Sequence, residues 1–289
     1  MLWRTASRSF DLTTRGLIMG VLNVTPDSFS DGGRYVDPTA AITRGLQMVA
    51  DGADILDIGG ESTRPGATPV DAEEELRRIL PVITGLQAQS AVPISIDTMK
   101  ARVAAAAMAA GAEIINDISG LQHDPDMARV AAETGAGLVL MHLRGTPRTM
   151  QQQPEYTDVV AEVRDRLLAA YHEAVAAGVK PGCIAFDPGI GFGKTLEHNL
   201  ALLRALPEFQ IHGRPVLLGV SRKSFIGHLL GNADPLAREA PTTALTAWSR
   251  QHGVRILRVH AVKESAQALR MMEAILGEGG TGGSPEKRL

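Results

Sequence analysis

The sequence predicts an α/β protein that folds as a single (β/α)₈ TIM barrel, with its active site at the carboxyl-terminal ends of the strands. About eight short β-branched runs alternate with Ala-, Leu- and Glu-rich helical stretches, which is the pattern of repeated βα units around a parallel sheet. The runs are nearly continuous in apolar residues, as expected for parallel strands that are covered on both faces. The chain of 289 residues also has a usual size for one such barrel.

Each predicted strand is a short run rich in Val, Ile and Leu, and the first is LIMGVLNV. The predicted strands span residues 17–24, 54–60, 93–98, 113–119, 137–142, 183–189, 215–221 and 255–260. A helical stretch follows every run, which gives predicted helices at 38–52, 71–88, 99–111, 124–135, 158–178, 195–206, 238–253 and 263–277. A doubly wound open sheet is the main alternative. That fold usually carries a GxGxxG turn after its first strand, and residues 20–33 lack this motif.

Composition excludes several classes of partner and location. A net charge of -3, without a run of Lys and Arg, disfavours nucleic-acid binding. No segment reaches about 18 apolar residues, and the first residues lack the apolar stretch of a signal peptide, so we expect no membrane association. The single cysteine, Cys183, cannot form an internal disulfide, which favours a reducing cytoplasm.

The sequence predicts one folded domain followed by a flexible tail. No Gly-, Ser- or Pro-rich linker interrupts the βα series, so residues 1–277 are expected to form one domain. The last residues, within GEGGTGGSPEKRL, are too polar and Gly-rich to repay the entropy of ordering. Residues 278–289 are therefore expected to form a flexible tail.

Polar residues occur where nearly every predicted strand ends. In a TIM barrel these ends converge on one mouth, where active sites of this fold lie. They are Asn23, Glu61, Thr63, Arg64, Asp97, Asn116, Asp117, His142, Asp187, Ser221, Arg222, Lys223, Arg258 and His260. Helix capping alone could explain Asp97 or Asn116, but not the whole set.

Three of these positions can be interpreted from strand geometry. Arg258 lies inside an apolar strand and needs a partner if it is buried, for which a bound anion is suited. Side chains two positions apart share a face, so Arg258 and His260 together predict an anion site. Asp117 points away from its neighbour Asn116, which favours a structural role.

Loops on the same side add to the prediction. The segments GGESTRPG, FDPGIGFGKT and SDGG allow the backbone to approach a ligand closely. The connections 24–37 and 143–157 are longer than usual and are candidate lids.

Seven segments resemble the motifs of the dihydropteroate synthase family, and they occur in the family's order. They are NVTPDSFSDGG (23–33), GGESTRPG (59–66), SIDT (95–98), INDISG (115–120), FDPGIGFGKT (186–195), SRKS (221–224) and RVH (258–260). The resemblance covers about residues 14–277. Arg144, where relatives often carry Gln, lies outside the motifs.

The resemblance implies a transferase of folate biosynthesis that condenses 6-hydroxymethyl-7,8-dihydropterin diphosphate with p-aminobenzoate, with Mg²⁺ present. By this resemblance Asp187 and Asn116 would bind the two edges of the pterin. Asp97 would meet N8-H and stabilise the cationic methylene, and Lys223 would hold the N5 and O4 side. The implied catalytic residues are Asp97, Lys223, Arg258 and His260.

The resemblance assigns the remaining substrate contacts to strand ends and loops. Thr63, Arg258 and His260 match the diphosphate pocket, and Asn23 matches the Mg²⁺ ligand. The other implied substrate-binding residues are Phe29, Asp31, Arg64, Pro65, Met141, Phe192 and Ser224, mostly around the aminobenzoate. The family resemblance also implies a homodimer and a sulfonamide target.

Two alternatives stay open within this interpretation. A pterin-dependent methyltransferase would share the barrel and the Asp and Asn anchors, although Arg258 and His260 argue against it. A non-catalytic pterin-binding paralogue is the other, although the intact NVTPDSFSDGG and STRPG segments argue against degeneracy.

Overall fold

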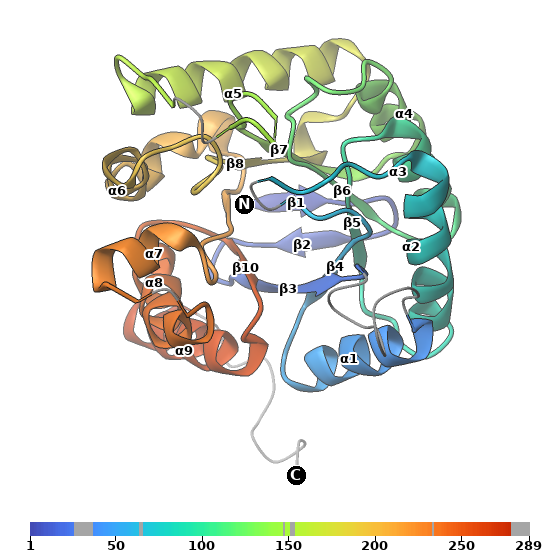
Figure 1. Cartoon of the computed structure of the whole chain (residues 1–289), viewed down its shortest axis with the longest axis horizontal. Coiled ribbons are helices and arrows are strands. Elements are labelled where there is room, and N and C mark those ends of the chain that lie inside the picture. Colours follow the sequence, from blue (N-terminus) through green and yellow to red (C-terminus); the bar gives the residue numbers. More distant parts are fainter. Residues whose placement is uncertain (26–36, 64–65, 147, 151–153, 233, 279–289) are drawn as a thin grey trace.

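The computed structural model describes residues 1–25, 37–63, 66–146, 148–150, 154–232 and 234–278. Eight parallel strands form a barrel that is surrounded by helices (Figure 1), which confirms the predicted TIM barrel. The barrel strands are β3 (Leu17–Asn23), β4 (Ile55–Gly59), β5 (Ile94–Asp97), β6 (Ile114–Asp117), β7 (Gly137–Met141), β8 (Ile184–Asp187), β9 (Leu217–Leu218) and β10 (Ile256–Val259).

The sheet closes on itself between its first and last strands in the pairing order. Neighbours pair in the order β8-β7-β6-β5-β4-β3-β10-β9. An isolated parallel bridge between Phe186 and Val216 joins β8 to the start of β9, and the Phe186 amide donates to Pro215 O over 3.0 Å. Barrel closure leaves these strand ends facing a common mouth.

The helices follow the strands nearly as predicted. They are α1 (Pro38–Ala50), α2 (Ala72–Gln87), α3 (Ala101–Ala109), α4 (Met127–Thr134), α5 (Val159–Ala176), α6 (Leu196–Arg204), α7 (Ser224–Leu230), α8 (Glu239–Gln251) and α9 (Val262–Ile275). Short 3₁₀ turns lie at η1 (Pro181–Cys183), η2 (Leu206–Phe209), η3 (Ile211–Gly213) and η4 (Leu236–Arg238).

Two of these elements differ from the sequence prediction. The strand expected at 215–221 has only two residues in β9, with an isolated bridge at Val216 before it and a turn at residues 221–222 after it. Helix α7, which follows at once, was not predicted. It is only seven residues long and ends at Gly231 in the left-handed conformation, so its apolar periodicity is too short to be recognised.

Inward-facing residues divide the barrel interior into an apolar layer and a polar layer. One interior cluster contains Leu17, Met19, Ile55, Ile114, Val139, Ala185, Leu217 and Ile256. Two positions further along their strands, the same inward face presents Asp57, Asn116, Met141, Asp187 and Arg258. The amino-terminal part of the barrel is therefore a packed core, and its carboxyl-terminal part is polar.

A hairpin that the sequence analysis did not predict covers the apolar end. Strands β1 (Leu2–Arg4) and β2 (Ser9–Asp11) pair antiparallel, and Figure 1 shows them crossing the barrel axis at its far end. Trp3 is fully buried in the interior cluster, and its indole N–H donates to Cys183 O over 2.8 Å. The hairpin thus closes the barrel opposite the mouth.

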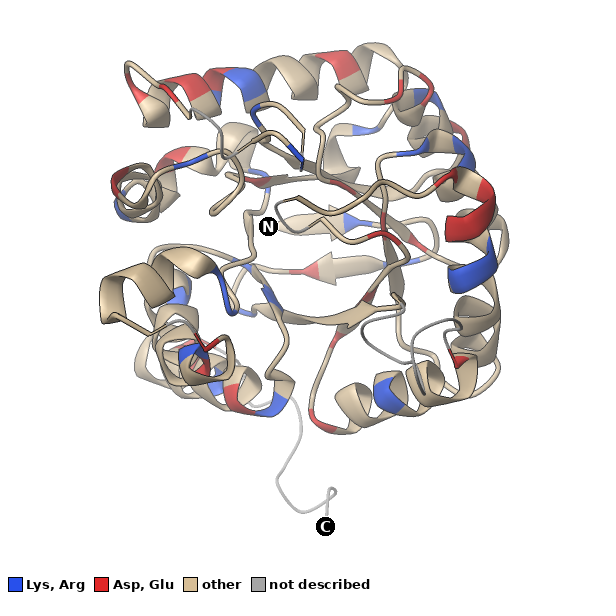
Figure 2. Cartoon of the chain, in the orientation of Figure 1, with Lys and Arg blue, Asp and Glu red and all other residues tan. Residues whose placement is uncertain are grey.

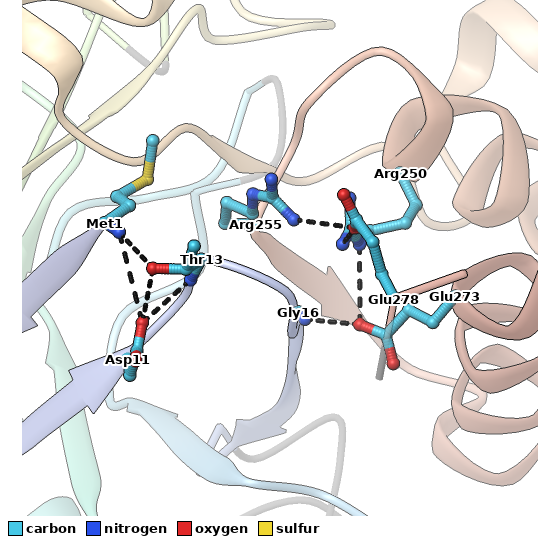
Figure 3. A network of polar contacts seen from close by, with 8 residues as sticks. All are labelled: Met1, Asp11, Thr13, Gly16, Arg250, Arg255, Glu273 and Glu278. Carbon is cyan, nitrogen blue, oxygen red and sulfur yellow. Dashed lines mark hydrogen bonds and ion pairs between the residues drawn. The ribbon is translucent and has the colours of Figure 1, made fainter. Parts of the chain in front are cut away.

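The last described helix is tied to the barrel by a buried arginine (Figure 3). Arg250 is 2% exposed and forms ion pairs with Glu273 and Glu278, and Glu273 also accepts from the Gly16 amide. Glu278, which the sequence analysis placed in the tail, also pairs with Arg255 over 3.3 Å. The remaining tail residues, 279–289, lie outside the described part of the chain.

The charged residues of the outer surface are mixed in sign. In Figure 2, basic and acidic segments alternate along the helices around the barrel. Among the described residues, no helix is both long enough and apolar enough to span a membrane.

Candidate active site

The centre of the polar layer is an arginine held between two carboxylates. Arg258, on β10, donates from Nε to Asp57 Oδ2 over 2.6 Å and from Nη2 to Asp97 Oδ2 over 2.7 Å. Asp57 is fully buried and Asp97 nearly so. The sequence analysis expected a bound anion as the partner of Arg258, and the structure shows that two carboxylates from β4 and β5 partner it.

Asn116 extends this cluster on the next strand. Its amide Nδ2 donates to Asp57 Oδ2 over 3.1 Å. The other oxygens of both carboxylates, Asp57 Oδ1 and Asp97 Oδ1, are buried and have no hydrogen-bond partner among the described residues, and the same holds for Ser95 Oγ. Buried polar atoms are costly when unpaired, so this layer is suited to a ligand that donates hydrogen bonds.

Strand register sets which residues meet at the mouth. Asn23 pairs with Gly59, Gly59 with Asp97, and Asp97 with Asn116, so these four residues form one row across β3 to β6. A Cβ at Gly59 would lie 3.7 Å from both Asn23 Oδ1 and Asp97 Oδ2. Glycine here keeps the space between these oxygens open.

The opposite side of the mouth carries Asp187 and Lys223. Asp187 ends β8 beside Met141, and its Oδ1 accepts from the Gly189 amide over 2.7 Å. Lys223 precedes α7, donates to Ile190 O, and its Nζ lies 4.3 Å from the centre of the Phe192 ring. The loop after β8 therefore holds the anchor carboxylate and the ammonium of Lys223 together.

Burial and neighbouring charges shift the pKa values of these groups. Burial, with the repulsion of Asp57 added, raises the pKa of Asp97 to about 7 against the attraction of Arg258. Burial also raises the pKa of Asp187. Burial lowers the pKa of Lys223 to about 7, although Asp187 opposes the shift. Asp57 and Asp97 raise the pKa of Arg258 despite its burial, so this residue stays charged.

The remaining expected residues are less concentrated. The His260 Nδ1 atom lies 3.0 Å from Ser221 Oγ, which also accepts from the His260 amide. Ser224 is exposed at the start of α7, and Thr63 is partly buried after β4. Phe29, Asp31, Arg64 and Pro65 lie outside the described residues, as does most of the first long loop.

Asp117 has the structural role that its strand parity predicts. Its Oδ1 accepts from the amide and the hydroxyl of Ser119, and its Oδ2 accepts from the Leu121 amide over 2.8 Å. These bonds stabilise the turn after β6, where Leu121 has a positive φ of 68°. The carboxylate is therefore engaged in shaping the loop.

A cavity of about 520 Å³ opens among the loops that follow β4 to β7. It is lined by Glu61, Ser62, Ala67, Pro69, Met99, Lys100, Ser119, Gln122, His123, Leu143, Gly145, Thr146, Arg148 and Thr149. The arginine–carboxylate cluster, formed by Asp57, Asp97, Asn116 and Arg258, does not line this cavity. We assign the chemistry to the cluster, because its buried charges and unpaired oxygens are the features that a reaction centre needs.

Sequence analysis missed two residues of this site. Asp57 lies in the run DILDIGG, and its parity with Ile55 places a carboxylate on an inward face, which was an available signal. Lys194 lies in a Gly-rich loop but is 3% exposed and contacts His142 and Phe192. Loop lysines are normally solvated, so the sequence carried no signal for its burial.

Comparison with known proteins supports one family. The profile of the family described as "Pterin binding enzyme" matches residues 19–260. The dihydropteroate synthase of Mycobacterium leprae is 52% identical over 268 residues, which cover 91% of this chain and 94% of that protein.

Solved structures agree with this result. The Yersinia pestis dihydropteroate synthase, solved with a sulfonamide drug, is 41% identical with a TM-score of 0.90, covering 96% of this chain and all of that chain. The Xanthomonas albilineans dihydropteroate synthase in complex with 7,8-dihydropteroate is 42% identical with a TM-score of 0.86 over the same shares.

Proposed function

The chain belongs to the pterin binding enzymes and, among them, to the dihydropteroate synthases, and from this we propose that it condenses 6-hydroxymethyl-7,8-dihydropterin diphosphate with p-aminobenzoate. The C–O bond to diphosphate breaks and a C–N bond to the aminobenzoate amine forms, with loss of one amine proton. The products are 7,8-dihydropteroate and diphosphate, and the enzyme is an alkyl or aryl transferase. The observation that carries the proposal is the cluster at the strand ends, in which the buried Asp97, Asn116 and Asp187 lie with the partly buried Lys223 and Arg258.

The pterin ring is proposed to lie in the polar layer. A pterin presents its 2-amino group and N3-H side by side, and a carboxylate such as Asp187 accepts both. Asp187 is buried, and one of its oxygens already accepts from Gly189, which fixes its orientation. Asn116 binds the other ring edge, and Lys223 binds the N5 and O4 side. Asp97 Oδ1, which is buried without a partner among the described residues, accepts from N8-H.

Charge balance in the layer favours heterolysis of the C–O bond. Three buried carboxylates, Asp57, Asp97 and Asp187, lie in this layer, and Arg258 pairs with the first two. A negative environment stabilises a cationic pterin methylene while diphosphate departs. The proposed catalytic residues are therefore Asp97, Lys223, Arg258 and His260, with Thr63, Arg258 and His260 toward the leaving group.

The residues near the leaving group fit Mg²⁺. Asn23 Oδ1 and Asp97 Oδ2 lie around Gly59, each 3.7 Å from where a Cβ on that residue would be. No group of three or more His, Cys, Asp and Glu side chains suited to a metal occurs among the described residues. Mg²⁺ commonly takes one or two protein oxygens together with substrate phosphates and water, so a single amide ligand suits it. When bound, the ion supplies charge neutralisation for the departing diphosphate.

The aminobenzoate is proposed to enter beside Phe192. This ring already lies against Lys223, and Ser224 is exposed nearby at the start of α7, where it can bind a carboxylate. Met141 contributes an apolar contact beside Asp187. Phe29, Asp31, Arg64 and Pro65 complete this site in the proposal. A sulfonamide would compete for the same space.

A homodimer in the cytoplasm is part of the proposal. Leu229, Leu230, Leu236, Met271 and Ile275 are large apolar side chains that are more than half exposed, and they lie on α7, η4 and α9. A shared surface on this side of the barrel would bury them. We expect Leu230→Glu to convert a dimer to a monomer in light scattering, and a wild-type monomer would refute this part.

The test of the function is a diphosphate-release assay. The purified protein should release diphosphate only when the pterin diphosphate, p-aminobenzoate and Mg²⁺ are all present, and dihydropteroate should form in equal amount. Methyl transfer from a folate would instead support the methyltransferase. Pterin binding without turnover would support the non-catalytic paralogue.

A further inference from the structure

Lys194 is a buried lysine that the proposed mechanism does not use. It lies in the loop between β8 and α6 and is 3% exposed. Its Nζ lies 2.9 Å from Phe192 O, 3.0 Å from His142 Nδ1 and 3.4 Å from His142 O. An ammonium group has three N–H donors, and here three acceptors surround it.

The state of His142 suits this arrangement. Burial, with the charge of Lys194 added, lowers the pKa of His142 to about 2, so its imidazole is neutral and Nδ1 can accept. Burial and the nearby Lys223 also lower the pKa of Lys194. The described residues form no ion pair with Lys194, so its position depends on these three hydrogen bonds.

These bonds pin a loop that carries two parts of the active site. Between Asp187 and Lys194, the loop presents Ile190 O to the Lys223 ammonium and the Phe192 ring to the same group. A Cβ at Gly191 would lie 2.8 Å from Lys223 Cδ, so the loop backbone packs directly on the lysine stem. The Phe192 ring therefore depends on the same residue whose carbonyl Lys194 binds, whereas Lys223 binds the loop at Ile190, nearer the strand.

Lys194 also joins this loop to the end of β7. The His142 amide donates to Asp187 O over 3.0 Å, and a Cβ at Gly189 would overlap His142 O. Tyr156 adds one hydrogen bond to Gly193 O over 2.9 Å. The loop is thus held at its start by the strand, in its middle by Asn199 Oδ1, which accepts from the Gly191 amide over 2.7 Å, and at its end by Lys194 and Tyr156.

We propose that Lys194 is a positioning residue of the synthase reaction, which places the Phe192 ring by binding the Phe192 carbonyl to the end of β7. The proposal rests on the proposed function, because Phe192 borders the aminobenzoate there. Asp187 is held independently, through the Gly189 amide and the β7–β8 pairing. Loss of Lys194 should therefore affect aminobenzoate more than pterin.

The test compares Lys194→Met, which keeps the length and removes the donors, with Lys180→Met, which changes an exposed lysine remote from the site. We expect Lys194→Met to raise KM for p-aminobenzoate by about tenfold and to change KM for the pterin diphosphate by less than about twofold. Lys180→Met should leave both values at the wild-type level. An equal change in both KM values, or none, would overturn the proposal.

A double-mutant cycle tests whether Lys194 acts through Phe192. In Phe192→Leu, the further change Lys194→Met should add little to KM for p-aminobenzoate, because the ring to be positioned is already absent. Multiplicative effects would contradict the proposal. If Lys194→Met does not fold, His142→Leu tests the proposal instead, since it removes the Nδ1 acceptor of Lys194. It should show the same KM split more weakly, whereas His142→Asn, with an oxygen acceptor in this region, should retain more of the wild-type value.

An inactive wild-type protein would refute the proposed function. A wild-type enzyme whose Lys194→Met variant shows no KM split would refute only the role of Lys194.

Discussion

Replacing Asp57 with Asn should move the acidic limb of the pH–rate profile to lower pH. Asp57 and Asp97 bind the same guanidinium, and the charge of Asp57 contributes to raising the pKa of Asp97 to about 7. Asn keeps the shape of Asp57 and removes its charge. Asp97 should then lose its proton more easily in the free enzyme.

The expected fall in the pKa of Asp97 can be worked out from Coulomb's law. Two unit charges about 5 Å apart repel by about 3 kcal/mol at an effective dielectric constant of about 20. One pKa unit corresponds to about 1.4 kcal/mol, so the upper bound is about 2 units, and partial screening leaves about 1 unit. The lost charge-assisted hydrogen bond with Arg258 should also lower the free energy of unfolding by about 1.5 to 3 kcal/mol.

The measurement is kcat/KM for the pterin diphosphate across the pH range, because this ratio reports the ionisation of the free enzyme. In the wild type, activity should rise as Asp97 loses its proton near pH 7 and fall as Lys223 loses its own, which gives a narrow bell. Asp57→Asn should widen the bell on its acidic side. Asp126→Asn, a change at a carboxylate that is 61% exposed, is the matched control. An acidic limb that stays in place or moves to higher pH would refute the reasoning.

Three further changes test the anchor, the hairpin and the ion. Asp187→Asn should lose pterin binding in calorimetry but raise Tm by about 2 to 4 °C at pH 8, since about 1 kcal/mol of buried-charge cost is removed. Because the folded-state pKa of Asp187 is raised, this gain in Tm should shrink as the pH falls toward the ordinary pKa of an aspartate. A gain in Tm that is constant with pH would contradict the prediction. Trp3→Ala should lower the free energy of unfolding by about 3 to 5 kcal/mol in urea, whereas Leu2→Ala, at an exposed position, should change it by less than about 0.5. Removal of Mg²⁺ with EDTA should abolish diphosphate release and leave Tm within about 1 °C, because one amide ligand contributes little to folding; a large fall in Tm would indicate a structural ion.

The barrel could be predicted from sequence because every βα unit repeats the same local pattern. Each strand run and each main helix stretch carried its own signal, so that errors at single boundaries did not accumulate. The N-terminal hairpin lacked such a signal. Its strands have three residues each, and their stability comes from Trp3 packing against residues on distant strands. Tertiary contacts of this kind are not visible in a local window.

The candidate site likewise has residues that the sequence predicts and one that it does not. Asp97, Asn116 and Asp187 could be predicted as candidates because each lies at or next to the carboxyl end of a strand, which is where active sites of this fold lie. Lys194 could not, because its burial depends on how a glycine-rich loop folds back onto His142. The positive φ values at Gly189, Gly191 and Gly193 make this path possible, but sequence alone does not select it.

Asp57 lies where the apolar layer of the barrel interior, which stabilises the fold, gives way to the charged layer of the candidate site. On β4 the inward residues are Ile55 and then Asp57, so one step of strand period separates the packed core from a buried charge. A buried carboxylate destabilises the fold unless it is paired. Arg258 supplies the partner of Asp57 from β10, which lies two strands from β4 in the pairing order. Arg258 can reach two carboxylates because β10 pairs with β3, which brings the last strand of the chain beside the first barrel strands. The pairing of β10 with β3 is therefore what lets Arg258 stabilise the charged layer. Inside the barrel, the buried carboxylates Asp57, Asp97 and Asp187 lie beyond the apolar layer, toward the carboxyl-terminal ends of the strands, where a charged substrate can complete their pairing.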